Sequence, residues 1–231
     1  MKENVFYAFV FLLVLVFGVP CKAESGRIGG EVVVDRVVAL VGAAGDSGRD
    51  ISIITAYELD IEARLLLAER SHSVDGIAGR PIPQRLLDSV LETMIDHQLI
   101  VGEASRFQLI SVTEEDIESE RQNIEQRLGG PGSLVRFQTT IGVPRELVDG
   151  ILRRRALVAA FIQRNIQIST RVADADIEEA YRSGDHPFGD LPLEEIRASL
   201  DAFLVARRQR ERLAQWLEET RGRSRIRIIE Q

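Results

Sequence analysis

The segment 84–100 carries the most regular apolar pattern in the chain and constrains the fold more than any other feature. Pro83 precedes it and suits the first turn of a helix, where a missing N–H costs no hydrogen bond. The spacing of three and four residues places the apolar side chains on one broad face of an α-helix. Such a face has to be buried, either inside this protein or against another polypeptide. The face consists of Leu87, Val90, Leu91, Met94, Ile95, Leu99 and Ile100.

Local start signals predict further helices along the chain. Thr55 with Glu58, and Thr113 with Asp116, have the spacing of a capping box, in which each side chain bonds the other residue's backbone N–H. We therefore expect one helix to begin after Thr55 and another after Thr113.

Two prolines predict the starts of the last long helices, at Pro144 and Pro192. Shorter helices are expected over 134–141 and 174–181, and residues 183–191 read as a linker. For the helix after Pro192 we expect one buried stripe, made of Ile196, Leu200, Phe203, Leu213, Trp216 and Leu217.

Three short segments have the composition of β-strands. Val32–Val41 is rich in β-branched residues and ends at a glycine, while Ile51 and Ile53 alternate with polar neighbours. Arg225–Ile228 alternates polar and apolar side chains like an edge strand. We expect this last strand to pair with Val32–Val41. The predicted fold is therefore mainly α, a multi-helix domain with a small sheet that joins the N-terminal and C-terminal strands.

The first 23 residues have the pattern of a secretory signal peptide. Lys2 precedes an apolar run from Val5 to Val19, and Cys21 and Ala23 form a small-x-small exit. An uncleaved membrane anchor is the alternative, but the run is shorter than the roughly 20 residues that span a bilayer. Lipoprotein processing at Cys21 fits poorly because proline precedes the cysteine. The pattern predicts export to the periplasm, with residues 24–231 as one domain.

Composition excludes several classes of function. The net charge of −7 argues against nucleic acid as the main partner, because phosphate contacts supply most of that affinity. The basic runs Arg153–Arg155 and Arg207–Arg212 do not reverse this balance, and glutamates near the second run indicate a solvated helix face. After residue 23 the chain has no cysteine, so it has neither a disulfide nor a thiolate metal site.

No constellation of residues indicates catalysis. The three histidines, His72, His97 and His186, have no metal-binding spacing, and His97 is interpreted as structural. Acidic clusters fall in first turns of helices, where they favour the helix dipole. We therefore predict no enzyme, and we assign no catalytic, cofactor-binding or metal-binding residue.

Several ordered patterns resemble the SurA-like periplasmic chaperones, which have a trigger-factor-like peptide-binding domain. Together they cover nearly the whole chain after the signal peptide, in the family's order. The matching segments are Val34–Val41, Ile54–Thr55 with Glu58–Asp60, Leu147–Ile168, Val172–Glu178, Pro192–Ile196, Trp216–Glu219 and Ile226–Ile229.

The sequence departs from this family at two places. Only residues 172–191 lie between the helical core (24–171) and the closing helix and strand (192–231), where relatives carry parvulin-type prolyl isomerase domains of about a hundred residues. The resemblance therefore implies no isomerase activity here. The turn from Gly42 to Asp50 is also longer than the family's usual connection.

The resemblance implies a periplasmic holdase that binds unfolded envelope or outer-membrane proteins, with no small-molecule substrate, no cofactor and no membrane span after signal removal. The apolar face within residues 86–100 is a candidate client surface or equally a part of the core, so client-binding residues stay unknown. The alternative is a non-catalytic adaptor with one fixed protein partner. A prolyl isomerase is a third hypothesis with no residues to support it.

Overall fold

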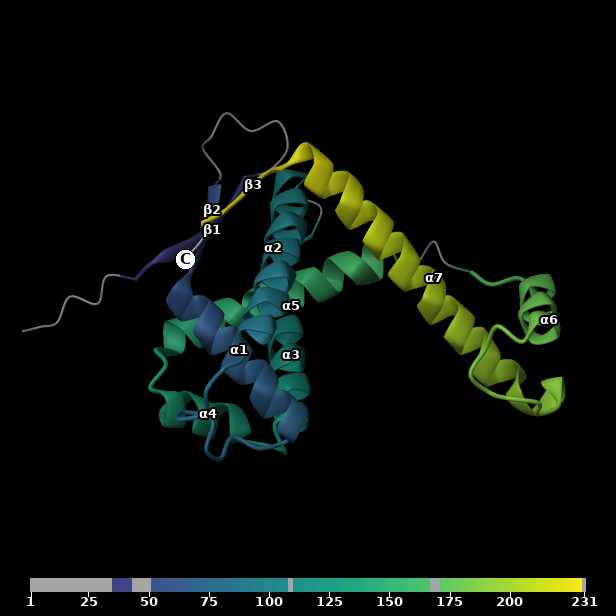
Figure 1. Cartoon of the computed structure of the whole chain (residues 1–231), viewed down its shortest axis with the longest axis horizontal. Coiled ribbons are helices and arrows are strands. Elements are labelled where there is room, and N and C mark those ends of the chain that lie inside the picture. The colour runs from purple at the N-terminus through teal and green to yellow at the C-terminus, as the bar shows by residue number, and fades with distance from the viewer. Residues whose placement is uncertain (1–34, 43–50, 108–109, 167–170, 230–231) are drawn as a thin grey trace, which may run out of the picture. The chain divides into compact units, whose positions relative to one another are not determined.

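The computed structural model describes residues 35–42, 51–107, 110–166 and 171–229, which form a mainly helical structure with a small antiparallel sheet (Figure 1). The predicted fold class is confirmed. The predicted signal peptide and Val32–Val34 lie outside the described residues. The elements are β1 (Val37–Gly42), β2 (Ile51–Thr55), α1 (Ala56–Ser71), α2 (Gln84–Phe107), α3 (Glu114–Arg127), α4 (Ser133–Ile141), α5 (Arg145–Asn165), α6 (Asp174–Ser183), α7 (Leu193–Arg223) and β3 (Arg225–Ile228).

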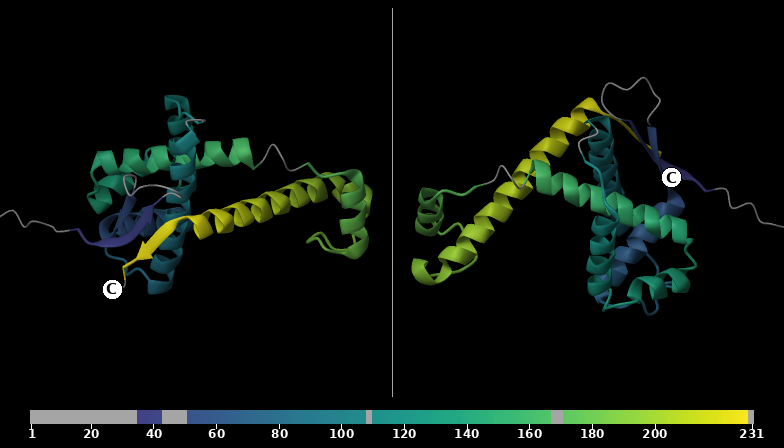
Figure 2. Two further views of the ribbon diagram at one scale, coloured as in Figure 1. Left: turned by 90° about the horizontal axis from the view of Figure 1, so that it is seen from above. Right: turned by 180° about the vertical axis from the view of Figure 1, so that it is seen from behind.

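The three strands are ordered β2–β1–β3, and both pairs are antiparallel. The expected pairing of the first strand with the last is confirmed: β3 follows α7 directly and lies along β1 (Figure 2). The expected strand is wrong at Asp35 and Arg36, because β1 begins at Val37. The carbonyl oxygen of Arg36 accepts a hydrogen bond from the backbone N–H of Ala56 at 2.7 Å. The Asp35 carboxylate accepts one from the backbone N–H of Tyr57. These two residues thus bind the start of α1 rather than the sheet.

The predicted helix starts are confirmed at the level of single hydrogen bonds. At α1, the Thr55 hydroxyl oxygen accepts from the Glu58 N–H at 3.2 Å, and the Glu58 carboxylate accepts from the Thr55 N–H at 3.3 Å. Thr113 and Asp116 form the same reciprocal pair at α3. The helices α5 and α7 begin directly after Pro144 and Pro192. Local chemistry therefore fixes these boundaries.

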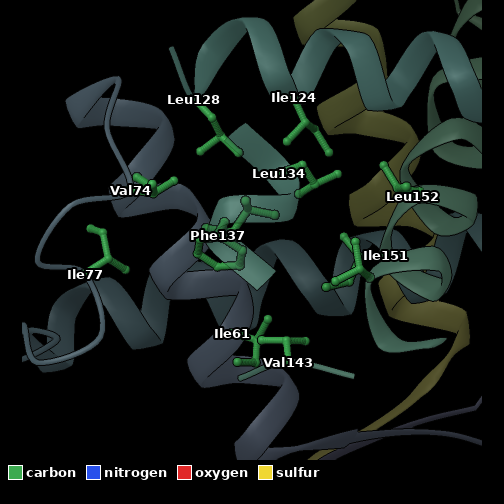
Figure 3. Packing of buried hydrophobic residues seen from close by; sticks show 13 residues of the cluster. Ile61, Val74, Ile77, Ile124, Leu128, Leu134, Phe137, Val143, Ile151 and Leu152 are labelled. Atoms are coloured by element: carbon green, nitrogen blue, oxygen red, sulfur yellow. The ribbon is translucent and has the colours of Figure 1, made fainter. Parts of the chain in front are cut away.

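Two apolar clusters build the part of the protein around α1. The first packs α1, α3, α4 and α5 around Phe137, which is 1% exposed (Figure 3). The second joins the sheet to α1 and α2 through Val38, Ala39 and Ile54. The apolar face of α2 belongs to this second cluster and to a third at its C-terminal end. Val90, Met94, Ile95, Leu99 and Ile100 are all buried there.

Helix α7 contributes all six residues of the expected stripe to apolar packing, but the stripe is divided between two separate clusters. Its N-terminal half buries Ile196, Leu200 and Leu204 against α6 and the following linker. Its C-terminal half places Trp216 and its apolar neighbours, only partly buried, against the C-terminal ends of α2 and α5, where the Trp216 and Phe161 rings are 4.9 Å apart. The sequence predicts a stripe, but which partner each half meets depends on tertiary structure.

Arg207 and Arg208, the first two arginines of the second basic run, tie α6 and its linker to α7, whereas Arg210 and Arg212 are exposed, as expected for a solvated helix face. The Arg208 guanidinium bonds the Asp176 carboxylate at 2.8 Å and also donates to the carbonyl oxygen of Arg171. Arg207 bonds the carboxylate of Asp185 in the linker. The exposed fractions of these two arginine side chains, 33% and 38%, show that they are only partly solvated.

Candidate functional site

Exposed apolar side chains concentrate on and beside the small sheet. The described residues include seven large apolar side chains that are exposed, and five of them lie in β2, the first turn of α1, or at β3. Ile51 and Ile53 are 49% and 51% exposed, and Ile228 is 47% exposed. Such a concentration in one region of the protein is the kind of feature that marks a contact surface. The five are Ile51, Ile53, Tyr57, Ile228 and Ile229.

The strand register assigns these side chains to faces. Residues directly opposite one another in an antiparallel pair point to the same side of the sheet. Ala39 and Ile54 are opposite one another and fully buried, so their side faces the helices. The other side, here called the outer face, carries Leu40, Ile51, Ile53, Arg225 and Arg227.

Both outer strands have an edge that is not paired within the described residues, because the sheet contains only β2, β1 and β3 there. The Ile229 N–H donates to the Val38 carbonyl oxygen at 2.9 Å, which makes Ile228 and Ala39 a non-hydrogen-bonded pair. By alternation, the backbone groups of Ile226 and Ile228 point away from β1.

The same alternation applies on the β2 side of the sheet. The backbone N–H and C=O of Leu40 bond β3, so those of Ala39 and Val41 bond β2. Ile53 and Ile51 are opposite Leu40 and Gly42, so their own backbone groups point away from β1, to the free edge of β2. Each outer strand thus offers unpaired N–H and C=O groups, which an extended peptide can bond.

The two arginines of the outer face carry uncompensated charge. Among the described residues, no carboxylate bonds Arg225 or Arg227, whereas arginines elsewhere, such as Arg155 and Arg221, each bond two carboxylates. Both side chains are exposed. The outer face therefore combines an apolar strip on β2 with a positive strip on β3.

Firm attachments hold this sheet in place. The inner face packs on α1 and α2, and the Thr55–Glu58 capping box fixes the turn from β2 into α1. The other end of the sheet depends on α7. The Arg221 guanidinium bonds the Asp96 carboxylate at 2.6 Å and the Glu92 carboxylate at 2.8 Å, so it joins the last turn of α7 to α2 just before β3.

A buried ion-pair network lies between α1 and α5. The Glu62 carboxylate, 6% exposed, bonds Arg154 at 2.8 Å and Arg155 at 2.9 Å, and Arg155 also bonds Glu69 at 2.8 Å. Burial alone raises the pKa of Glu62, but the two guanidinium groups outweigh it and the pKa is lowered. Because each carboxylate is held by cations, the network is suited to joining helices rather than to proton transfer.

His97 on α2 lies close to this network. Burial, the largest effect, lowers its pKa to about 4, while the Glu62 carboxylate opposes the shift and Arg155 and Arg154 add to it. The histidine is therefore neutral in the folded protein near neutral pH, in line with its predicted structural role.

This shift predicts how stability depends on pH. The folded state holds His97 unprotonated down to about pH 4, whereas the unfolded chain takes up the proton near its ordinary value of 6.5. The free energy of unfolding should therefore fall as the pH drops from 6.5 toward 4. His97→Gln should flatten this slope in urea titrations at a series of pH values. A variant that keeps the full slope would assign it to other groups.

The other two histidines also have local structural roles. His72 ends α1 with a positive φ of 50°, and its Nδ1 is 2.9 Å from the Arg127 carbonyl oxygen. There Gly129 approaches closely, since a Cβ on it would lie 2.7 Å from the His72 carbonyl oxygen. His186 stacks between Tyr181 and Phe188 in the linker. The three histidines lie in separate surroundings.

No group of three or more histidine, cysteine, aspartate or glutamate side chains has a geometry that could hold a metal ion in the part of the chain that the structure describes. None of the helices in the described segments is long and apolar enough to cross a membrane.

The α2 face does not provide the open surface that a client would need. Its central residues are buried, so the alternative interpretation as core is correct. The exposed side chains lie on the sheet instead, which sequence reasoning did not single out. Alternation in Ile51–Ile54 and Arg225–Ile228 was the available signal, but alternation alone cannot show which side is covered.

Comparison with known proteins adds no relative. Neither a protein-family model nor a curated protein sequence matches the chain.

Proposed function

We propose that this protein is a periplasmic holdase for unfolded envelope proteins, outer-membrane proteins among them, and that it acts without isomerase activity. The observation that carries the proposal is the sheet, on which exposed isoleucines lie beside unpaired strand edges. The signal-peptide pattern and the ordered resemblance to SurA-like chaperones agree with it.

The chemistry of this surface suits clients that lack a fixed fold. Strand edges bond main-chain groups, which every extended polypeptide offers, so they bind without demanding one sequence. Exposed isoleucines add apolar contact area that tolerates different side chains. Unfolded β-barrel proteins contain segments of alternating apolar and polar residues, which can present one apolar side to such a surface.

The direct test is suppression of client aggregation. We expect protein purified from its host, at stoichiometric amounts, to slow the light scattering that follows dilution of a urea-unfolded outer-membrane β-barrel protein. Unchanged aggregation would contradict the proposal. Co-purification from the host with a single stoichiometric protein, rather than with many envelope proteins, would favour the fixed-partner adaptor.

A paired substitution locates the activity on the sheet. Ile51→Ser with Ile53→Ser removes two side chains that are about half exposed and leaves the buried Ile54 in place. We expect about thirtyfold weaker client binding, because each isoleucine loses roughly 1 kcal/mol of apolar contact. Val135→Ser on α4 is the matched control, since Val135 is 57% exposed and lies outside the sheet. Equal loss in both proteins would show that the effect is not specific to the sheet.

A further inference from the structure

The edge of β3 differs from the edge of β2 in its chemistry. The sequence of β3 is Arg225-Ile226-Arg227-Ile228, so its side chains alternate between charged and aliphatic. The sequence of β2, Ile51–Thr55, contains no charged residue. Any charge selection by the sheet therefore takes place at β3.

The register of β3 defines what a strand added to its edge would meet. Arg225 and Arg227 lie on the outer face, opposite Gly42 and Leu40, while Ile226 and Ile228 lie on the other face, opposite Val41 and Ala39. A new strand would bond the outward backbone groups of the two isoleucines. Its side chains would then alternate between positions opposite the arginines and positions opposite the isoleucines.

The two sets of positions favour different residues. Opposite charges and aliphatic pairs stabilise cross-strand neighbours, and like charges destabilise them. Arg225 and Arg227 have no carboxylate partner within the described residues, so an acidic cross-strand neighbour could pair with them. Ile228 is 47% exposed, so an aliphatic cross-strand neighbour could pack on it. We propose that the β3 edge binds an extended polypeptide segment in which acidic and aliphatic side chains alternate.

This inference deepens the proposed function and rests on it, because it states which client segments the sheet selects. Arginines on an edge strand also discourage pairing with basic strands or with a second copy of β3. The same two charges thus reject one class of strand and attract another, as specific recognition requires.

Three labelled ten-residue peptides test the proposal by fluorescence anisotropy with protein purified from its host. The first alternates glutamate and valine, the second alternates lysine and valine, and the third has the first composition with its glutamates grouped. We expect the first to bind at least tenfold more tightly than either of the others. Comparable binding of the lysine peptide or of the grouped peptide would overturn the proposal.

Substitutions then locate the contact. Arg225→Gln with Arg227→Gln changes exposed side chains and should weaken binding of the acidic peptide about fivefold to tenfold, the sum of two cross-strand charge pairs. Ile228→Pro removes an outward N–H and should abolish binding, whereas Ile228→Ala keeps that N–H and should retain most of it. The matched control is Val135→Ala on α4, an exposed aliphatic side chain outside the sheet, which should leave the affinity for the acidic peptide unchanged.

Amide hydrogen exchange gives a measurement that does not depend on the variants. The bound peptide should slow exchange of the Ile226 and Ile228 amides, and protection of Ile51 and Ile53 instead would overturn the assignment to β3. Failure of all peptides to bind, in protein that still suppresses aggregation, would overturn this inference and leave the proposed function standing. Peptide binding by protein that does not suppress aggregation would support the β3 edge and contradict the holdase function.

Discussion

Replacing Glu62 by glutamine should destabilise the protein by about 3–5 kcal/mol, because it leaves Arg154 and Arg155 buried without their shared anion. Glutamine keeps the size and shape of the side chain, so the loss reports charge rather than packing. The two hydrogen bonds at 2.8 and 2.9 Å join α1 to α5 across 92 and 93 positions of sequence. The measurement is the midpoint of urea unfolding followed by circular dichroism.

Glu92→Gln provides the matched control. Glu92 also bonds an arginine at 2.8 Å, but its side chain is 51% exposed, and exposed pairs contribute only about 0–1 kcal/mol. A Glu62→Gln protein as stable as the Glu92→Gln protein would contradict the assignment. The lowered pKa of Glu62 adds a second signature: its contribution is present at neutral pH and disappears only below the pKa of the unfolded carboxyl, in a more acidic range than the effect of His97.

Phe137→Ala should cost a similar amount, about 3–5 kcal/mol, by leaving a cavity where four helices meet. Phe137 is 1% exposed, and its neighbours come from α1, α3, α5 and the loop after α1 (Figure 3). Because the surrounding side chains belong to separate elements, they cannot all close around the space. Chemical unfolding of the variant measures the loss.

The control for this substitution lies two residues away on the same helix. Val135 is 57% exposed, so Val135→Ala should change the free energy of unfolding by no more than about 0.5 kcal/mol. A loss below about 1 kcal/mol for Phe137→Ala would show that α4 contributes little to the stability of this core.

The candidate site and these stabilising contacts are separate, which gives mutational work a clear design. The sheet attaches to the helices through its inner face, through the cap of α1 and through Arg221. Substitutions at Ile51, Ile53, Arg225 or Arg227 alter exposed side chains and leave those attachments in place. Loss of client binding in such variants, with unchanged stability, would therefore report the surface itself.

Local features of the sequence determined where most elements begin. A capping box needs only two residues three positions apart, and a proline at a helix start needs only its own ring. Both signals therefore mark a helix start independently of the tertiary structure around them. The closing strand was also predictable, since alternation is a property of a few consecutive residues.

Tertiary structure alone decided which surfaces are open and which charges are buried. In the sequence, the Arg153–Arg155 run has no feature that distinguishes it from other basic helix segments. In the folded protein, Glu62 of α1 bonds two of its arginines, Arg154 and Arg155. The wide apolar face of α2 is core, and the sheet carries the exposed isoleucines, although both have regular apolar patterns. A pattern states which side chains share a face, whereas burial depends on what the rest of the chain places against that face, and this information is distributed over residues far apart in the sequence.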